Sequence, residues 1–153
     1  MWEYTVKSDT SLHDCYIEKV CEKNGTLIVR LPDGIWLSES CPHNPFDKTI
    51  KTFEAQVRLS DFVFEGCYIF KDISIFYKPI LTKRIEIKKE KLIQKVNSSE
   101  WKIEFLYDYK NCDRHIFDCI VWTKDRKNFE CLIFAEYSDI EYSWNDINKD
   151  KEW

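Results

Sequence analysis

Apolar and polar residues alternate at every second position along most of this chain. The segment TLIVRL at 26–31 places Leu27, Val29 and Leu31 on one side of an extended backbone. A period of two is the pattern of a half-buried β-strand, whereas a helix repeats every 3.6 residues. Turn signals such as Asn24-Gly25 separate the runs at short intervals. This spacing favours antiparallel pairing, because parallel crossovers need a dozen or more connecting residues.

Similar runs recur through the sequence, and one stretch differs from them. In 89–96, Leu92, Ile93 and Val96 share one stripe at helical spacing. The expected strands lie at 15–31 (a hairpin), 35–37, 52–59, 67–77, 83–89, 101–109, 115–124 and 129–137. The predicted fold is therefore mainly β: an antiparallel β-sandwich or partly open barrel of about eight strands with one short helix.

Three of these runs carry finer expectations. In 101–109 the odd positions, from Trp101 to Tyr109, are predicted to share one core-facing side. Residues 115–124 are apolar on both sides, which indicates a central strand covered on each face. Lys71 interrupts the alternation of 67–77 and predicts a bulge or a change of sheet there.

The chain of 153 residues is expected to form a single β-rich domain over 1–153, since no repeat, linker or composition shift divides it. Residues 137–153 are polar and aromatic, and two structures remain open for them: a short helix or a loosely held tail. The 83–89 run, with Ile85 and Ile87 between charges, is predicted to be an exposed edge strand.

Charge and composition exclude several classes of protein. A net charge of −4 gives no overall attraction for phosphate backbones, so no nucleic-acid partner is predicted. No run approaches 18 apolar residues and the N-terminus lacks a signal-peptide pattern, so neither a membrane partner nor secretion is expected. The seven cysteines then indicate reduced thiols in the cytoplasm.

Leu12-His13-Asp14-Cys15 is the part of the chain that most resembles catalytic machinery. On a strand, His13 and Cys15 would lie roughly 6.5 Å apart, whereas a nucleophile and its base need roughly 2.6–3.2 Å. We therefore predict no catalytic residue and interpret His13 and Asp14 as a structural turn at a strand entry.

Residues of the same turn also belong to a possible zinc ligand set. His13 and Cys15, with Cys41 and His43, supply a ligand set that zinc accepts. Each pair is separated by one residue rather than the usual two to four, so no metal is predicted. With three glycines in all, no loop can be glycine-rich, and no cofactor is expected.

The C-terminal segment suggests a partner. Residues 136–153 hold six acids and two lysines, together with tyrosine and tryptophan side chains. Aromatic residues beside acids are typical of protein-binding surfaces for basic partners. The predicted partner-binding residues are Tyr137, Asp139, Glu141, Tyr142 and Trp144. The alternative is a small-ligand-binding or enzymatic β-barrel whose aromatic-lined pocket contains His13 or His115.

The opening hairpin also carries a resemblance. The run LHDCYIEKV…NGTLIVRLPDGIW resembles the start of several small bacterial β-rich families, some of which look like immunity proteins of polymorphic toxin systems. The matching residues are Leu12, His13, Asp14, Ile17, Leu27, Val29 and Leu31. The resemblance implies a cytosolic, non-enzymatic protein-interaction module and transfers no binding residue.

Overall fold

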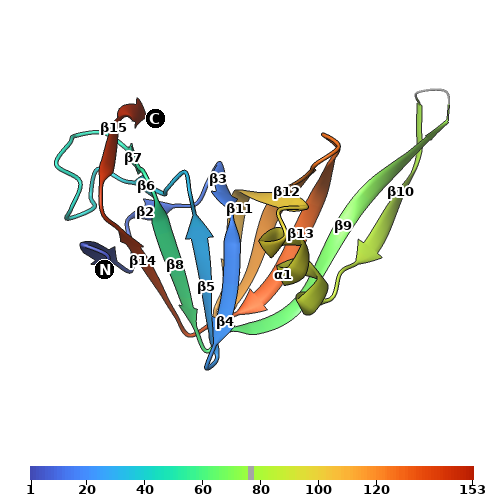
Figure 1. The fold of residues 1–153 in the computed structure, drawn as a ribbon, viewed down its shortest axis with the longest axis horizontal. Helices are drawn as coiled ribbons and strands as arrows, with labels where there is room; N and C mark the ends of the chain where they lie inside the picture. The colour runs from blue at the N-terminus through green and yellow to red at the C-terminus, as the bar shows by residue number, and fades with distance from the viewer. Residues whose placement is uncertain (76–77) are drawn as a thin grey trace.

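The structure is a computed structural model that describes residues 1–75 and 78–153, with side chains described outside 74–80. It contains three antiparallel sheets and a short helix, and the described strands do not close any sheet into a barrel (Figure 1). The mainly β prediction is confirmed, in its sandwich form.

The first sheet has five strands in the order β1-β14-β8-β5-β4. Its strands are β1 (Tyr4–Val6), β14 (Asp139–Trp144), β8 (Ala55–Ser60), β5 (Thr26–Leu31) and β4 (Lys19–Lys23). The β4–β5 hairpin turns at Asn24 and Gly25, whose φ angles of 51° and 75° lie in the left-handed region. The Asn-Gly turn expected from the sequence is thus present.

The second sheet has six strands in the order β10-β9-β13-β12-β11-β3. Its strands are β10 (Lys78–Glu86), β9 (Val63–Ile75), β13 (Asn128–Glu136), β12 (Arg114–Thr123), β11 (Trp101–Asn111) and β3 (Cys15–Ile17). β10 forms one edge, as expected for the charged 83–89 run. Two of the residues in the predicted 67–77 run, Phe76 and Tyr77, lie outside the described residues.

The third sheet is small and has the order β15-β7-β6-β2. Its strands are β15 (Ile147–Glu152), β7 (Ile50–Thr52), β6 (Trp36–Leu37) and β2 (Thr10–Ser11). Gly34, with a φ of 78°, lets the chain pass close to β7: a Cβ there would lie 2.2 Å from the Thr52 carbonyl oxygen. Only glycine fits this approach without displacing the neighbouring backbone.

One long two-stranded ribbon links the three sheets. β7, β8 and β9 run antiparallel to β15, β14 and β13, and the same pairing offset holds across the sheet boundaries. The pairs Thr52–Ile147, Ala55–Trp144, Ser60–Asp139 and Val63–Glu136 mark its course. The ribbon bends at Asp61, whose φ is 50°. The bulge or change of sheet expected near Lys71 is wrong, because β9 passes through Lys71 as one strand with an unshifted pairing to β10.

The two larger sheets diverge from this corner and enclose an apolar interior, with α1 (Lys89–Asn97) in the opening (Figure 1). Leu92 and Val96 are the buried residues of the helix, as its apolar stripe predicted. The core is contributed by both sheets and includes Leu31, Ile103 and Val121, all of them fully buried or nearly so.

A bulge in β11 overturns one expectation from the sequence. The pairing with β12 shifts between Phe105 and Tyr107, which leaves Leu106 as an extra residue. Before the shift Ile103 and Phe105 face the core, as predicted. After it the alternation is inverted, and Tyr107 and Tyr109 are each 56% exposed instead of buried.

The C-terminal segment is neither a helix nor a loose tail, because residues 139–152 form β14 and β15. β14 lies between β1 and β8 and directs Ile140, Tyr142 and Trp144 toward the core. The segment DIEYSW has the period of two of a strand, with Ile140, Tyr142 and Trp144 as its apolar positions. The run is short and lies in a stretch rich in acidic residues, so the pattern is weak.

Candidate interaction surface and cleft

The predicted partner-binding residues lie on or just before β14, and their rings are largely inside the molecule. Trp144 is fully buried, Tyr137 is 7% exposed and Tyr142 is half-buried. The acids are on the outside: Asp139 is paired with Lys7, and Glu141 lies 3.8 Å from Arg58. These residues therefore do not display aromatic rings beside acids on one surface.

His13 and Asp14 lie in a tight turn before β3. The Cys15 N–H donates to the Leu12 carbonyl at 2.9 Å, and Asp14 has a φ of 56°. His13 Nδ1 lies 2.5 Å from the Leu106 carbonyl oxygen, and its Nε2 lies 3.4 Å from the Asp14 carboxylate. Both ring nitrogens thus have partners other than the thiol.

The Cys15 thiol is fully buried and faces the carbonyl of His13 at 3.5 Å. Burial raises its pKa to about 12, so it stays protonated at neutral pH. A protonated thiol with no base beside it does not act as a nucleophile.

A row of aromatic rings crosses the surface beside this turn. It runs Trp36, Trp153, His13, Tyr107, Tyr109, with successive ring centroids 5.2, 5.1, 5.5 and 6.1 Å apart. We call it the aromatic row. Trp153 is 65% exposed, and the two tyrosines are also exposed. Rings at these separations stabilise one another and present a continuous apolar surface to solvent.

The row is held in place from beneath. Trp36 Nε1 donates to the His13 carbonyl at 2.8 Å. Lys51, whose side chain is 5% exposed, lies 5.1 Å from the Trp36 ring and forms a 2.8 Å ion pair with Asp33. The same carboxyl group accepts the Tyr16 N–H at 3.1 Å. A buried pair with several hydrogen bonds is geometrically rigid, which fixes the turn that positions His13.

The aromatic row continues onto the outer face of the six-stranded sheet, where Tyr107 pairs with Asp118 and Tyr109 with Ile116. This outer face carries a set of half-exposed apolar side chains, opposite in direction to the buried ones. They are Tyr68, Phe70, Ile116, Ile120, Trp122, Leu132 and Phe134. The sequence of 115–124 predicts a strand covered on both faces, and this is wrong for the outer face. Among the described residues, the even-numbered positions of this strand are partly exposed to solvent.

Two acids lie within this apolar area. Asp118 is the cross-strand neighbour of Leu132, and Glu130 is that of Ile120. Neither carboxylate has an ion-pair or hydrogen-bond partner among the described side chains, which are those outside 74–80. Three basic residues of the same face are engaged with neighbours: Arg114 with Glu136 at 2.7 Å, Arg84 over the Tyr68 ring, and Lys102 over the Tyr16 ring.

Below the aromatic row a cleft of about 450 Å³ opens between β11 and β14. Its walls include His13, Tyr107 and Trp153 from the row, and Tyr142 from β14. Asp108 also lines it, because the β11 bulge that turns Tyr107 outward turns Asp108 inward, opposite Phe117.

A buried polar network supports Asp108 from behind. His115 is 3% exposed, and its Nδ1 lies 3.0 Å from the Asp108 carboxylate and 2.9 Å from Tyr137 Oη. A carboxylate only accepts hydrogen bonds, so we assign the hydrogen to Nδ1, which donates a hydrogen bond to Asp108. The His115 ring is stacked on Tyr137 at 4.0 Å, which fixes its orientation. Burial raises the pKa of Tyr137 well above its usual value.

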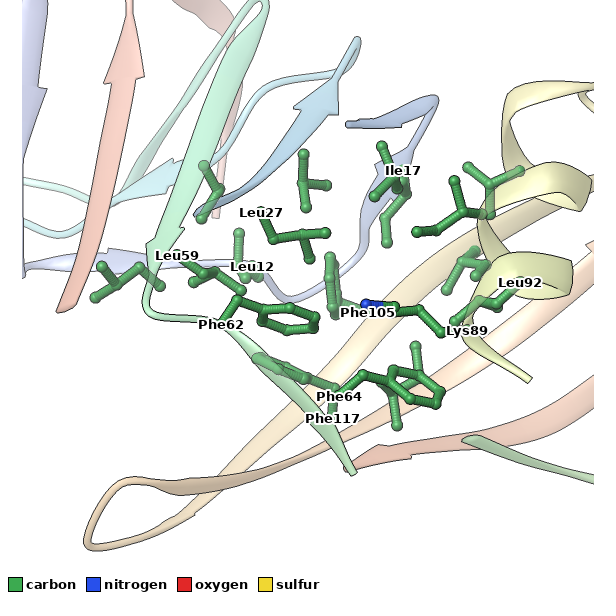
Figure 2. A pocket seen from close by; sticks show the side chains of 18 residues that line it. Leu12, Ile17, Leu27, Leu59, Phe62, Phe64, Lys89, Leu92, Phe105 and Phe117 are labelled. Atoms are coloured by element: carbon green, nitrogen blue, oxygen red, sulfur yellow. The ribbon is translucent and has the colours of Figure 1, made fainter. Parts of the chain in front are cut away.

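The interior between the sheets holds a second, smaller space beneath α1. This cavity has a volume of about 70 Å³ and is lined by side chains such as Leu27, Leu59, Phe62 and Phe105, which converge from the two sheets (Figure 2). Lys89, the charged residue of its lining, pairs with Glu22 at 2.9 Å. Ligand pockets usually measure roughly 300–1,000 Å³, so we interpret this cavity as part of the core.

Other chemistries find little support in the described residues. No group of three or more His, Cys, Asp or Glu side chains is placed to hold a metal ion there. Of the four zinc candidates, Cys41 is buried, and His43 packs on Tyr4 and Trp144 rings. In the same part of the chain, we find no helix with the length and apolarity needed to cross a membrane.

The fold and surface together define a mainly β protein with an exposed aromatic row and an acidic, partly apolar sheet face. Comparison of the chain with models of known protein families, with curated proteins and with solved structures gave no match.

The sequence places Tyr107 and Tyr109 in the core, because they continue the alternation of Ile103 and Phe105, and the structure shows both on the surface. The sequence contains one signal: Phe105-Leu106-Tyr107 is a run of three adjacent apolar residues inside an otherwise alternating strand, and such a run is compatible with a bulge.

Proposed function

We propose that this protein is a non-enzymatic protein-interaction module of the immunity-protein type, and that it binds a basic protein. One observation carries the proposal: the aromatic row runs directly onto a half-exposed apolar sheet face that contains Asp118 and Glu130, two acids with no partner among the described side chains.

The chemistry of this surface favours a protein partner. Tyrosine and tryptophan bury a large area at a low cost in side-chain entropy and are enriched at binding hot spots. Carboxylates set among apolar groups attract basic partners and penalise acidic ones. The resemblance of the opening hairpin to immunity proteins supports the same class of function.

The proposal is tested with the products of the reading frames that flank this gene, each measured for binding by biolayer interferometry. A basic neighbour is expected to bind. The double variant Asp118→Lys/Glu130→Lys should weaken that binding at least about 10-fold, which corresponds to roughly 1.4 kcal/mol.

Glu39→Lys/Asp47→Lys is the matched control, because it changes the net charge equally in the loop of residues 38–47 and both residues are exposed. Its affinity should stay within about twofold of the unchanged protein. If both double variants lost the same affinity, the effect would come from the net charge of the protein and not from the position of Asp118 and Glu130. Binding that neither variant alters would place the interface elsewhere.

A second candidate function is supported by the cleft, whose volume of about 450 Å³ is in the range of small-ligand sites. A thermal-shift screen of charged and aromatic metabolites tests it. A ligand at 100 times its dissociation constant adds about 2.7 kcal/mol to the free energy of unfolding. The small-ligand function predicts that at least one metabolite stabilises the protein in this way. A screen in which no metabolite does so would contradict it.

A further inference from the structure

We propose that the cleft beside the aromatic row is a site for a guanidinium group, presented by an arginine side chain of the basic partner. The inference rests on the proposed function for the source of the arginine. The chemistry of the site is argued from Asp108, its buried support and the rings around it.

The carboxylate of Asp108 is oriented for this role. His115 donates to it from one side at 3.0 Å, and the side chain of Asp108 is still 37% exposed to the cleft. An ionised carboxylate has about four acceptor positions. His115 Nδ1 lies 3.0 and 3.2 Å from the two carboxylate oxygens and has a single hydrogen to donate, which leaves acceptor positions free for a ligand. Because His115 is itself buried and stacked on Tyr137, the geometry of Asp108 is set before any ligand arrives.

No cation of this protein occupies the carboxylate in the described residues. Lys110 is the nearest basic residue along the strand and pairs with His115 across the ladder, yet it forms no ion pair with Asp108 in that part of the chain. The site thus combines a negative charge with an open approach, which is the requirement for a cationic ligand.

The walls favour a planar cation over a compact one. Trp153 and Tyr142 are aromatic residues that line the cleft, and Tyr107, beside His13 in the aromatic row, borders it at the rim. A guanidinium group stacks on such rings while donating two parallel hydrogen bonds to a carboxylate, whereas an ammonium group does neither of these in the same way. The rings and Asp108 together therefore select arginine over lysine.

The site is tested with small probes on the whole protein. N-acetyl-arginine amide is titrated and followed by chemical-shift changes of the backbone amides. N-acetyl-citrulline amide has the same shape without the charge, and N-acetyl-lysine amide has the charge without the plane. The arginine probe should bind with shifts clustered at residues 10–13 and 105–108, at least about 10-fold more tightly than the citrulline probe.

Asp108→Asn should reduce the affinity for the arginine probe at least about 10-fold, because it removes the charge while keeping an acceptor for His115. Asp113→Asn, in the turn after β11, makes the same change in charge outside the cleft and should leave it unchanged. Tyr107→Ala is a second variant, at an exposed position outside the His115 network. It should also weaken the binding of the arginine probe.

Equal binding of the arginine and citrulline probes, or full retention of binding in Asp108→Asn, would overturn the guanidinium site. Equal binding of the lysine probe would overturn the selection for a planar group. If a basic partner is lost on changing Asp118 and Glu130 but is retained by Asp108→Asn, the interaction module stands and the partner does not supply the arginine.

Discussion

Two segments of this protein combine acids and aromatic rings in alternation, and they present opposite sides to solvent. In β14 the acids Asp139 and Glu141 face outward, while Tyr142 and Trp144 face the core. In β11, after the bulge, the rings of Tyr107 and Tyr109 face outward and the acid between them faces the cleft. Composition does not distinguish the two segments, and strand parity decides which one displays its rings.

The largest expected contrast is in stability. Trp144→Ala removes a fully buried ring and should lower the free energy of unfolding by about 3–5 kcal/mol. Trp153→Ala, at a position 65% exposed, should change it by less than about 0.5 kcal/mol. Guanidinium chloride unfolding followed by circular dichroism measures both. Similar losses in the two variants would mean that the rings of β14 and of the aromatic row are not differently packed.

The burial of Tyr142 in β14 should also make the free energy of unfolding depend on pH in the alkaline range. Burial raises the pKa of Tyr142 from 10.0 to about 12. Below pH 10 the phenol is protonated in both states and adds no pH dependence. Between pH 10 and 12 only the unfolded chain releases the proton, so the free energy of unfolding falls, by up to about 3 kcal/mol.

Tyr142→Phe should flatten this part of the stability curve relative to the unchanged protein. Cys15 and Tyr16 have raised pKa values as well, so the difference between the two slopes is the quantity to compare. Parallel curves from pH 9 to 12 would contradict the burial of the Tyr142 hydroxyl.

The smallest effect on folding should accompany a clear effect on binding. Tyr109→Ala removes an exposed ring and should alter the free energy of unfolding by less than about 0.5 kcal/mol. Its affinity for a basic partner should fall by about 1–2 kcal/mol, the range of interface aromatic residues. Calorimetric titration against that partner, with Phe53→Ala as a control at a position 54% exposed, separates the two quantities.

The sequence predicts the larger part of the fold because its alternation is regular. The hairpin at Asn24-Gly25, the helix beginning at Lys89 and the edge strand β10 all follow from periods and turn residues. The division into three sheets does not, because it depends on where strands bend. Asp61 changes the sheet through its backbone conformation, and aspartate at a turn does not by itself indicate a corner.

The candidate site was harder to predict for a related reason. A single extra residue, Leu106, exchanges the two sides of β11 and moves Tyr107 to the surface. Trp36 and Trp153 enter the row from distant parts of the chain, so no local pattern could associate them with His13. The acidic and aromatic composition of 136–153 predicts a partner-binding surface there, but the rings of β14 are largely buried.

The ribbon that passes through all three sheets has a consequence for how the chain folds. Its two strands come from widely separated stretches, since residues 51–70 pair with residues 130–148. Closing so large a loop costs entropy before the pairing contributes favourably, and folds rich in such distant contacts form slowly, over roughly milliseconds to seconds. The hairpins β4–β5 and β11–β12 connect neighbouring segments and are expected to form first, with the corner at Asp61 completed late.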